Sequence, residues 1–445
     1  MDTQTAQRLT DKYPLGEQLA EGKTKKIIGI KGQPDLVILA AKDDITAGDG
    51  AKRDLLEGKG ALATQTTCNV FRLLSACGIP VAYQIQDTMT SFVAHRCAML
   101  PYEVVVRREA HGSYLKRNPH ISKGHLFPQL VVEFFLKTSG KKWKEVELSC
   151  DDPLLMYKPD EAQQQMWLFD PSKPIHGSQP FRKLNYLDIV TQPNEKDLYP
   201  EMARIARQAF LVLEKAWQIE GRTLVDFKVE LGITTGGALL LADVIDNDSW
   251  RILDNGAHID KQVYRDGGDL GEVLVKYQQV ASLTDHFRIP RQRIVLWKGS
   301  GSDNVEAFMK ARDALGVLLP QNFDMPVIIC STHKEPERAI GTLRQMLQDV
   351  PDSVVIVYVG MSNAAGPVLS AGSMAPVITV PASFDNFHDD VWSCLRVPSN
   401  VPVSTMLSPA NAFSAALRIL AMRNPFFYAM LAEELEKRMV NTAPV

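Results

Sequence analysis

The chain has 445 residues, more than a single hydrophobic core usually organises, so at least two domains are expected. Apolar residues make up 45% and charged residues 23%, a composition typical of a globular protein, and no stretch is long and apolar enough to cross a membrane. The formal net charge of −3 excludes the strongly basic footprint of a nucleic-acid-binding protein, so anionic ligands have to be bound by local clusters of basic residues.

The N-terminal residues indicate a cytosolic protein, and the cysteine spacing argues against a structural metal site. Residues 1–10 are polar and lack the basic and then apolar order of a secretory signal, so the thiols are expected to stay reduced. The cysteines lie far apart, without a CxxC pair or a nearby histidine pattern, which argues against structural zinc. We interpret all of them as core thiols: Cys68, Cys77, Cys97, Cys150, Cys330 and Cys394.

The first part of the chain carries β-rich apolar runs and two helical patterns. The expected strands are Lys25–Ile30, Leu36–Ala40, Tyr102–Glu109, Leu130–Phe135, Val225–Leu231 and Ala238–Ile245. Residues 234–237 predict a hairpin turn between the last two. Apolar residues recur at three- and four-residue steps in Leu62–Ala76 and Glu201–Glu220, which predicts helices. We therefore expect an α+β domain with mostly antiparallel sheets.

A change of pattern near residue 290 predicts a domain boundary. A helix is expected over Leu270–His286, and Pro290 then lies in a basic stretch beyond it. Short apolar runs follow, each with a polar or glycine-rich turn and the first three with a helix: Ile294–Trp297, Pro326–Cys330, Val354–Val359 and Val377–Val380. This order is typical of a three-layer α/β domain with a doubly wound parallel sheet, flavodoxin-like or Rossmann-like. We predict a first domain at 1–268, a helical linker at 269–290 and a second domain at 291–445 that ends in a helix.

A lysine-rich turn and an acidic turn are the first candidate sites. Gly22, Lys23 and Lys25 at the entrance to a strand would let amides and ammonium groups approach a polyphosphate, although a solvated basic loop has the same composition. The turn is not a Walker A loop, because the spacing of its glycines is wrong. The stretch 43–50, which includes Asp49, is suited to a hard cation or a ligand amine or hydroxyl, or is a plain acidic turn.

The strand around residue 228 predicts a metal site. Charged and apolar residues alternate there, so Asp226, Lys228 and Glu230 share one face of the strand. Asp243 is expected on the returning strand close to Glu230, and two facing carboxylates repel each other unless a cation lies between them. Mg²⁺ carrying ATP is the natural candidate.

Two adjacent arginines, Arg107 and Arg108, precede Gly112 and Ser113. A guanidinium and a hydroxyl at this spacing could bind a phosphate or a carboxylate. Neighbouring side chains on a strand point to opposite faces, so only one of the two arginines is expected to reach a ligand.

These motifs together resemble the SAICAR synthetase family from about Tyr13 to Arg265. EGKTKKI, KDDITAGDGAKRDLLEGKG, VVRREAHGSYLKRNP, LVDFKVELG and LADVIDNDSWRILDNG are similar to its motifs and follow its order. The resemblance implies an ATP cleft in which Lys23 and Lys25 contact phosphates and Glu230 and Asp243 hold Mg²⁺. It implies that the phosphorylated, carboxylated substrate is bound by Arg107, Ser113, Arg251 and Arg265, and Asp49 is also expected to bind substrate. Lys228 and Asp246 are given supporting catalytic roles.

In the second domain, three turns should meet at the carboxyl ends of the strands: Gly299–Asp303, Ser331–Glu335 and Gly360–Pro367. The first would bind a phosphate at a helix terminus, or is a plain helix cap. The second brings an imidazole and an ammonium group to the same place. With SNAAGPVLSAG and DVWSCLRVPS, these turns resemble the animal-type AIR carboxylase family, which uses carbon dioxide without ATP or biotin.

This second resemblance implies roles residue by residue. Ser300 and Asp303 would bind the ribotide, Ser331 and Lys334 its phosphate, and His333 would transfer a proton. Ser362 and Asn363 would border the carbon dioxide pocket. Three positions depart from the family, since Met361 replaces an arginine and Ala364 and Glu335 replace glycines. A lost positive charge and added side chains near a small pocket would weaken the carboxylase.

Animal enzymes join the two activities in this order in one polypeptide, so the resemblance implies a bifunctional enzyme of purine biosynthesis. The alternative is a synthetase whose carboxylase-like domain only serves as an oligomerisation scaffold. A regulatory nucleotide-binding protein without turnover is disfavoured, since Lys23, Lys25, Glu230 and Asp243 are all present. The resemblance also implies a cytosolic homo-octamer built on the second domain, with small-molecule substrates and neither nucleic acid nor membrane as a partner.

Overall fold

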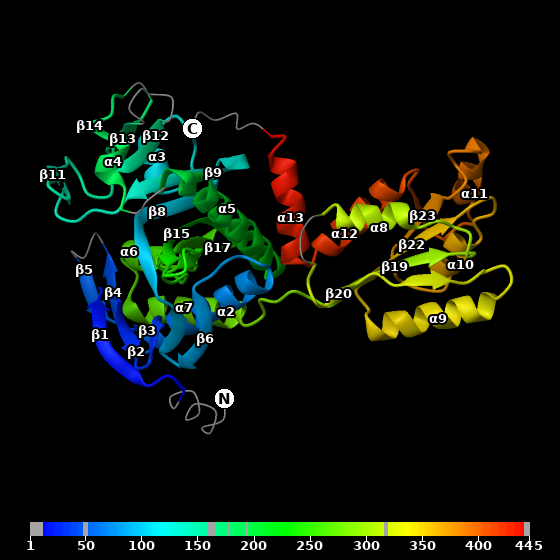
Figure 1. Cartoon of the computed structure of the whole chain (residues 1–445), viewed down its shortest axis with the longest axis horizontal. Helices are drawn as coiled ribbons and strands as arrows, with labels where there is room; N and C mark the ends of the chain where they lie inside the picture. Colours follow the sequence, from blue (N-terminus) through cyan, green and yellow to red (C-terminus); the bar gives the residue numbers. More distant parts are fainter. Residues whose placement is uncertain are drawn as a thin grey trace. The chain divides into compact units, whose positions relative to one another are not determined.

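The structure is a computed structural model that describes residues 12–47, 52–158, 165–176, 178–191, 195–315 and 319–439. The chain forms two compact units, Met1–Arg288 with Ala432–Val445, and Ile289–Leu431 (Figure 1). No helix in the described ranges is long and apolar enough to cross a membrane. All the cysteines are free, but only Cys68, Cys330 and Cys394 are buried, so the prediction of core thiols holds for half of them.

Antiparallel strands dominate the first unit, as predicted. One sheet has the order β1-β2-β3-β7-β6, and a larger one has the order β14-β13-β12-β9-β8-β15-β17-β18, with β16 beside β15. The strands are β1 (Leu15–Glu21), β2 (Lys25–Ile30), β3 (Gln33–Ala41), β6 (Tyr83–Thr88), β7 (Ser91–His95), β8 (Cys97–Glu109), β9 (Leu126–Leu136), β12 (Leu154–Lys158), β13 (Gln165–Phe169), β14 (Arg182–Asn185), β15 (Thr223–Thr234), β16 (Leu239–Ala242), β17 (Trp250–Asp254) and β18 (Ala257–His258). Two short ribbons pair β4 (Asp44–Ala47) with β5 (Lys52–Leu55), and β10 (Lys142–Trp143) with β11 (Val146–Glu147).

Helices cover these sheets and complete the α+β architecture. They are α2 (Lys59–Ala76), α3 (Ser113–Arg117), α4 (Tyr186–Ile189), α5 (Glu195–Ile219), α6 (Gln262–Arg265) and α7 (Leu270–Thr284). The long helix α5 packs against β8 and β15. Its inward face carries Phe210, Leu213 and Trp217, which are fully buried, so removing apolar surface from water fixes the helix on the sheet.

The predicted linker at 269–290 is mostly part of the first unit. Helix α7 packs against α2, and its residues Val273 and Tyr277 share a buried cluster with Ile45 and Tyr264. The apolar face of the helix thus finds its partner in the first domain, and the chain passes to the second unit after Arg288. The residues from Ala432 onwards also group with the first unit, although the sequence placed them in the second.

The second unit has the predicted parallel sheet, with the order β20-β19-β22-β23-β24 and β21 beside β19. Its elements are β19 (Gln292–Lys298), α8 (Glu306–Asp313), β20 (Phe323–Asp324), β21 (Val327–Ile329), α9 (Pro336–Asp349), β22 (Ser353–Val359), α10 (Ala365–Ala371), β23 (Val377–Pro381), η2 (His388–Asp390), α11 (Val391–Leu395), β24 (Ser404–Thr405), α12 (Pro409–Ala421) and α13 (Pro425–Glu436). Helix α13 ends in residues that belong to the first unit.

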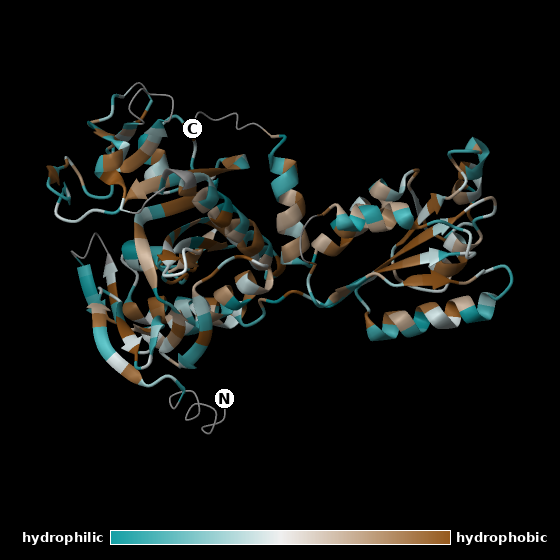
Figure 2. Ribbon diagram, in the orientation of Figure 1, coloured by the Kyte–Doolittle hydropathy of each residue, from teal (hydrophilic) through white to brown (hydrophobic). Residues whose placement is uncertain are grey.

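The core of the second unit lies on both faces of this sheet. Ile294 and Leu296 join one buried cluster that includes residues of α8 and α12. Val295 and Trp297, which alternate with them along β19, join a separate cluster that includes residues of α9 and α10. β19 and β22 are accordingly apolar between their ends, whereas α9 shows one hydrophilic face (Figure 2). This confirms the three-layer arrangement.

Among the differences in element bounds, two concern the candidate sites. The strand expected over Ala238–Ile245 ends at Ala242, because Asp243 has φ +63°, which is incompatible with extended backbone. The helix expected directly after Gly299–Asp303 begins only at Glu306, where the Asn304 side chain accepts a hydrogen bond from the Glu306 amide at 2.8 Å.

Candidate active sites

The lysine-rich turn is a tight connection between β1 and β2. The Gly22 amide donates to the Lys25 carbonyl at 2.9 Å, and the Lys42 amide donates to the Thr24 carbonyl at 2.7 Å. Lys23 is exposed in this turn, whereas Lys25 lies on β2 and forms an ion pair with Asp243. Burial lowers the pKa of Lys25 to about 8, although Glu230 and Asp246 favour its charged form. The structure therefore brings Lys25, Glu230 and Asp243 together.

Glu230 lies on β15 opposite Ala242, so Asp243 is one residue beyond the paired position and just past the end of the strand on which it was expected. The Glu230 carboxylate accepts a hydrogen bond from Lys137 at 2.6 Å. Each of the two predicted metal ligands is thus neutralised by an ammonium group. Carboxylate oxygens are the ligands that Mg²⁺ prefers, and Mg²⁺ commonly takes only one or two protein carboxylates together with water and phosphate oxygens. The pair fits that ion, although no described group of three or more potential ligands is clustered.

Lys228, on the same face of β15, is paired with Glu103 of the neighbouring strand at 2.8 Å. Burial disfavours its charged form, but Glu103 and Glu230 outweigh this effect and raise its pKa. Lys228 is therefore a fixed positive charge beside Glu230.

Asp246 belongs to a buried charge cluster that the sequence did not reveal. Its carboxylate accepts a hydrogen bond from the Asp248 amide at 2.9 Å. The Asp248 carboxylate in turn accepts hydrogen bonds from Lys261 at 2.8 Å and from Tyr277 at 2.6 Å, and the ammonium of Lys59 lies 3.8 Å away. Burial and the charge of Asp248 raise the pKa of Asp246. We name Asp246, Asp248, Lys59, Lys261 and Tyr277 the buried charge cluster.

Lys59 is the functional candidate missed from the sequence. It is 1% exposed at the start of α2 and, with Lys25 and Asp246, lines a cavity of about 20 Å³. That is enough space for a single water molecule. A lysine between two glycines, directly before a helix, is the signal that could have identified it. The amide of the second glycine, Gly60, donates to Asp43 at 2.7 Å.

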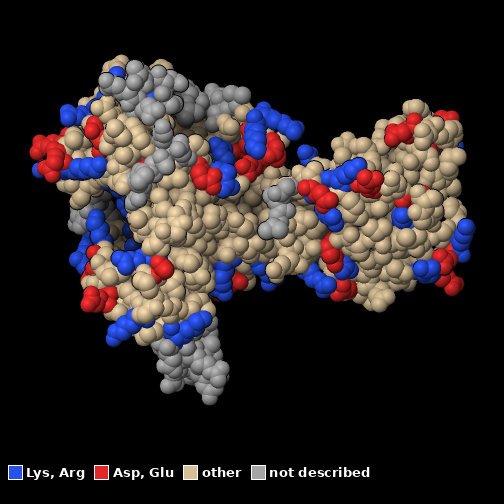
Figure 3. Space-filling view, viewed as in Figure 1, with Lys and Arg blue, Asp and Glu red and all other residues tan. Residues whose placement is uncertain are grey.

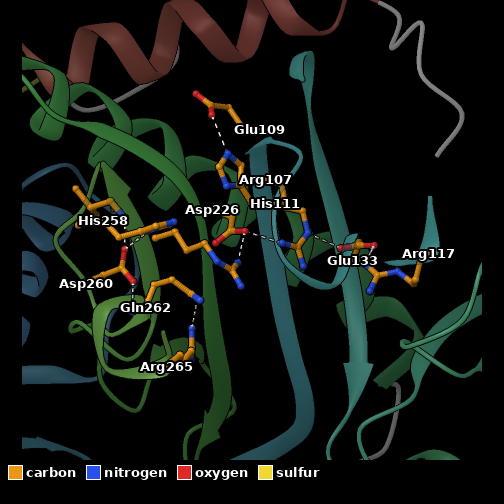
Figure 4. Close-up of polar contacts among 12 residues, drawn as sticks. Arg107, Glu109, His111, Arg117, Glu133, Asp226, His258, Asp260, Gln262 and Arg265 are labelled. Carbon is orange, nitrogen blue, oxygen red and sulfur yellow. Dashed lines mark hydrogen bonds and ion pairs between the residues drawn. The ribbon is translucent and has the colours of Figure 1, made fainter. Parts of the chain in front are cut away.

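Arg107 stands at the centre of a second cluster, between two carboxylates (Figure 4). Its Nε donates to Glu133 at 2.7 Å, and its Nη1 donates to Asp226 at 2.6 Å. Asp226 also accepts from Arg251 at 2.6 Å, and Glu133 from Arg117 at 2.5 Å. The cluster therefore contains three guanidinium groups and two carboxylates, and it carries net positive charge. The Nη1 atom of Arg117 is buried without a hydrogen-bond partner among the described residues.

Arg108 points away from this arginine cluster, as the strand geometry predicted. It donates to Glu214 at 2.6 Å and to Glu436 at 2.5 Å. Glu436 also accepts from Arg207 at 3.0 Å and from the Leu130 amide at 3.0 Å, and it is 4% exposed. We call Arg108, Arg207 and Glu436 the C-terminal anchor, because Glu436 lies near the end of the described chain.

Gly112 allows Arg251 to enter the arginine cluster. Its φ is +58°, and a Cβ atom there would lie 2.3 Å from Nη2 of Arg251. Ser113 follows at the start of α3, half-buried. Arg265, in contrast, is exposed at the end of α6, and its side chain donates a hydrogen bond to Gln262 at 3.4 Å. Asp49 lies outside the described residues.

Two histidines also face this region, and sequence reasoning did not select them. His111 lies 3.3 Å from Glu109, and His258 lies 3.1 Å from Asp260 (Figure 4). Their ring centroids are 6.3 Å apart and the rings are nearly perpendicular.

In the second unit, the predicted turns follow the adjacent strands β21, β19 and β22. The register pairs Lys298 with both Ile329 and Tyr358, so the three strands end at the same edge of the sheet. Nε2 of His333 lies 3.4 Å from the Ser362 hydroxyl, so the second and third turns meet. His333, Lys334 and Ser362 are all exposed.

The first turn is closed by its own side chains. Asp303 accepts a hydrogen bond from the Ser300 amide at 3.0 Å, and Lys298 donates to the Asp303 carbonyl at 2.8 Å. Ser331, half-buried, accepts the Glu335 amide through its carbonyl at 2.8 Å. The side chain of Asn363 is turned inwards, where it donates to Sγ of Cys394 at 3.2 Å and accepts from the Gly366 amide at 3.1 Å. Asn363 can therefore border a ligand only through its backbone.

Comparison with known proteins is consistent with both units. Residues 18–164 and 182–283 match the family model described as SAICAR synthetase, and residues 293–441 match the one described as AIR carboxylase. The chain is 35% identical over 435 residues to the probable multifunctional protein ADE2 of Caenorhabditis elegans, covering 96% of this chain and 95% of that protein. A bifunctional phosphoribosylaminoimidazole carboxylase/succinocarboxamide synthetase of Homo sapiens is 33% identical over 434 residues, covering 94% of this chain and 93% of that one. Among solved structures, a SAICAR synthetase in complex with ADP is 28% identical, with a TM-score of 0.46, covering 60% of this chain and 96% of that one.

Proposed function

Because the chain belongs to the SAICAR synthetase family through its first unit and to the AIR carboxylase family through its second, we propose that it catalyses two consecutive steps of purine biosynthesis. As a carboxy-lyase, it adds carbon dioxide to 5-aminoimidazole ribotide. As an ATP-dependent ligase, it then condenses the carboxylated ribotide with L-aspartate and releases the succinocarboxamide, ADP and phosphate.

The net positive arginine cluster carries the synthetase half of this proposal. The substrate of the synthetase bears both a phosphate and a carboxylate. Asp226 holds Arg107 and Arg251 in fixed positions from which they can donate to such an anion. Because the two carboxylates are already saturated by guanidinium groups, an added anion meets uncompensated positive charge. Ser113 and Arg265 are assigned to the same substrate, and we keep Asp49 in that set from the sequence motif.

The chemistry of the first unit requires activation of a carboxylate. ATP phosphorylates the ribotide carboxylate to an acyl phosphate, ADP leaves, and the amine of aspartate displaces phosphate to form the amide. Lys25, with Lys23, neutralises the phosphates of ATP, and Gly22 is assigned to the nucleotide as part of the same turn. Lys228 adds a fixed positive charge, and the raised pKa of Asp246 suits this carboxylate to accept the proton that the attacking amine loses.

Mg²⁺ is the metal that the donor set favours. Glu230 and Asp243 would hold it, in exchange for their present ammonium partners Lys137 and Lys25. When bound, the ion supplies neutralisation of phosphate charge that two lysines alone cannot give.

In the second unit, His333 is the group suited to move a proton. The ring carbon of the ribotide forms a bond to carbon dioxide and loses its proton, which the exposed imidazole can accept. Ser300, Asp303, Ser331 and Lys334 are assigned to the ribotide and its phosphate. Ser362 and the backbone of Asn363 border the carbon dioxide site. Neither ATP nor biotin is needed, since carbon dioxide itself is the electrophile.

We further propose a cytosolic homo-octamer assembled through the second unit. Large apolar side chains of this unit, Phe387, Trp392 and Leu395, are each about half exposed, which supports a contact with another copy. Acidic and basic side chains are interspersed on the face shown in Figure 3, which supports the absence of nucleic acid as a partner. The same mixture does not favour a membrane partner.

The scaffold-only alternative for the second unit is not favoured. His333 and Ser362 lie together despite Met361, Ala364 and Glu335 at the departing positions. Ala364 caps the start of α10 and Glu335 the start of α9, so neither added side chain prevents the turns from meeting.

The two activities can be tested on the same purified full chain. We expect ADP formation that requires both aspartate and the carboxylated ribotide, and we expect Lys25→Met to abolish it while carboxylation of aminoimidazole ribotide continues. His333→Ala should have the opposite effect. A chain that forms ADP but incorporates no labelled bicarbonate into the ribotide would instead support a synthetase carried on a scaffold.

A further inference from the structure

The buried carboxylate of Asp390 connects two loops of the second unit. Asp390 ends η2, directly before α11, and is 1% exposed. Its Oδ1 accepts the Met361 amide at 2.6 Å, and its Oδ2 accepts the Ser383 amide at 2.9 Å. The hydroxyl of Ser393 donates to the Asp390 carbonyl at 2.8 Å and lies 3.3 Å from Oδ1. Among the described residues Asp390 forms no ion pair, and the two amides are the closest donors to its carboxylate.

Met361 is held in a conformation that methionine rarely adopts. Its φ is +65°, in the left-handed region that favours glycine. Its side chain is 68% exposed, so packing does not fix this conformation. The hydrogen bond from its amide to Asp390 is therefore the interaction that compensates the strain.

The two loops approach so closely that only glycine fits beside Met361. A Cβ atom on Gly360 would lie 2.3 Å from the Ser383 hydroxyl. Asp390 binds one amide from each loop at this contact. The carboxylate thus fixes the loop after β22 against the loop after β23.

The next residue after Met361 is Ser362, whose hydroxyl lies 3.4 Å from Nε2 of His333. The backbone direction at Met361 decides where this hydroxyl points. A second hydrogen bond follows at Asn363, whose side chain donates to Sγ of Cys394 in α11. Asp390 and Cys394 therefore hold the two residues that flank Ser362 in the chain.

We propose that Asp390 is a positioning residue of the carboxylase site, which holds Met361 in the left-handed conformation so that Ser362 faces His333. This inference rests on the proposed carboxylase function of the second unit. Asp390 acts through the Met361 backbone and contacts no substrate.

The test compares carboxylation by the full chain with Asp390→Asn, and uses the exposed neighbour Asp389→Asn as the matched control. The amide keeps the size of the carboxylate but loses one acceptor oxygen, so we expect kcat for carboxylation to fall about ten- to a hundred-fold, as for other small misplacements of reacting groups. The aspartate-dependent ADP formation of the same molecules, with carboxylated ribotide supplied, measures the amount of folded synthetase and should stay constant.

A second substitution separates positioning from a general structural role. Glycine adopts positive φ without strain, so the double variant Asp390→Asn/Met361→Gly should have a much higher kcat than Asp390→Asn alone. The kcat of the single variant Met361→Gly is the reference for full recovery. In the chain with Asp390 intact, Met361→Val should lower kcat, because a β-branched residue resists positive φ while its exposed side chain leaves the core unchanged. The proposal would be overturned if Asp390→Asn had the same kcat as Asp389→Asn, or if Met361→Gly did not raise the kcat of the Asp390→Asn chain. An unsubstituted chain that forms ADP but carboxylates nothing would overturn the carboxylase function itself and this inference with it.

Discussion

Lys25 is the residue whose charge state should control the first reaction. Burial holds its pKa at about 8, well below the usual value of lysine, so the side chain is positive below that pH and neutral above it. A neutral lysine cannot neutralise an ATP phosphate. With Lys25 in its proposed role, the same burial that lowers its pKa would set an upper pH limit to ATP binding.

We predict that kcat/KM for ATP in the synthetase reaction falls as the pH rises through about 8, the pKa of Lys25 in the free enzyme. Lys25→Arg should move this fall to higher pH, because the guanidinium keeps its proton. The measurement is the initial rate of ADP formation at limiting ATP across the pH range. Lys23→Arg is the matched control, and an equal displacement of its profile would refute the assignment.

Lys59 shows how strongly one buried charge depends on its neighbours. Its ammonium lies 3.8 Å from Asp248 and is 2% exposed at the side chain. Removing it leaves the carboxylates of the buried charge cluster with Lys261 as the remaining ammonium.

Lys59→Met should therefore destabilise the first unit by about 3 kcal/mol, the usual cost of removing one member of a buried ion pair. It should also slow ADP formation, since Lys59 and Asp246 line the same small cavity. Urea denaturation and the steady-state rate measure the two effects. Lys276→Met, a change at a half-buried position of α7 outside the buried charge cluster, provides the control, and a Lys59→Met chain as stable as this control would exclude an important ion pair.

At the scale of the element, the turn before α3 determines how Arg251 enters the arginine cluster. Gly112→Ala places a methyl group against the guanidinium of Arg251 and also strains a positive φ. We expect a loss of more than about 1 kcal/mol in stability together with a raised KM for the carboxylated ribotide. Gly78→Ala has the same strain at φ +78° but nothing within 4 Å, so it should lose stability without a change in KM. Equal KM values for the two variants would argue against Arg251 as a substrate ligand.

Most elements could be predicted because their periodicity is local. Alternating or continuous apolar runs gave β2, β19 and β22, and the three- and four-residue steps gave α2 and α5. The end of β16 could not be foreseen, because it depends on the positive φ of Asp243 beside Lys25. Helix α7 was taken as a linker because its partner residue, Ile45, lies far away in the sequence.

The candidate sites were predictable to the extent that motifs carry them. Strand alternation predicted Glu230 as a metal ligand and the hairpin predicted Asp243, and the structure brings both beside Lys25. The buried charge cluster was missed because a sequence does not show that Lys59 is buried. Asn363 was assigned to a ligand, but the fold turns its side chain towards Cys394.

At the scale of the whole molecule, the first unit is built from two separate pieces of the chain. Glu436 lies 328 residues from Arg108, yet it is buried between Arg108 and Arg207. No local pattern predicts such a contact, so the C-terminal anchor could be found only in the structure.

Glu436→Gln should destabilise the first unit by about 3 kcal/mol, since it removes a buried charge and leaves Arg207 without its carboxylate. The nearby exposed Glu434, which pairs only with Lys437 in the described chain, gives the control Glu434→Gln, for which a change of less than about 0.5 kcal/mol is expected. The stability of the two variants is measured by thermal unfolding, with the loss of ADP formation as the signal. Equal stability of the two variants would show that the anchor contributes nothing.

The anchor also imposes an order on biosynthesis. Residues 1–288 emerge from the ribosome early, but Glu436 emerges only after the whole of residues 289–431 has been made. While the second unit is translated, Arg108 and Arg207 therefore lack the carboxylate of Glu436. Since domains generally fold as they emerge, the second unit can be complete while the first is still unfinished. A nascent chain stalled before Ala432 would thus carry a synthetase that has not yet reached its final stability.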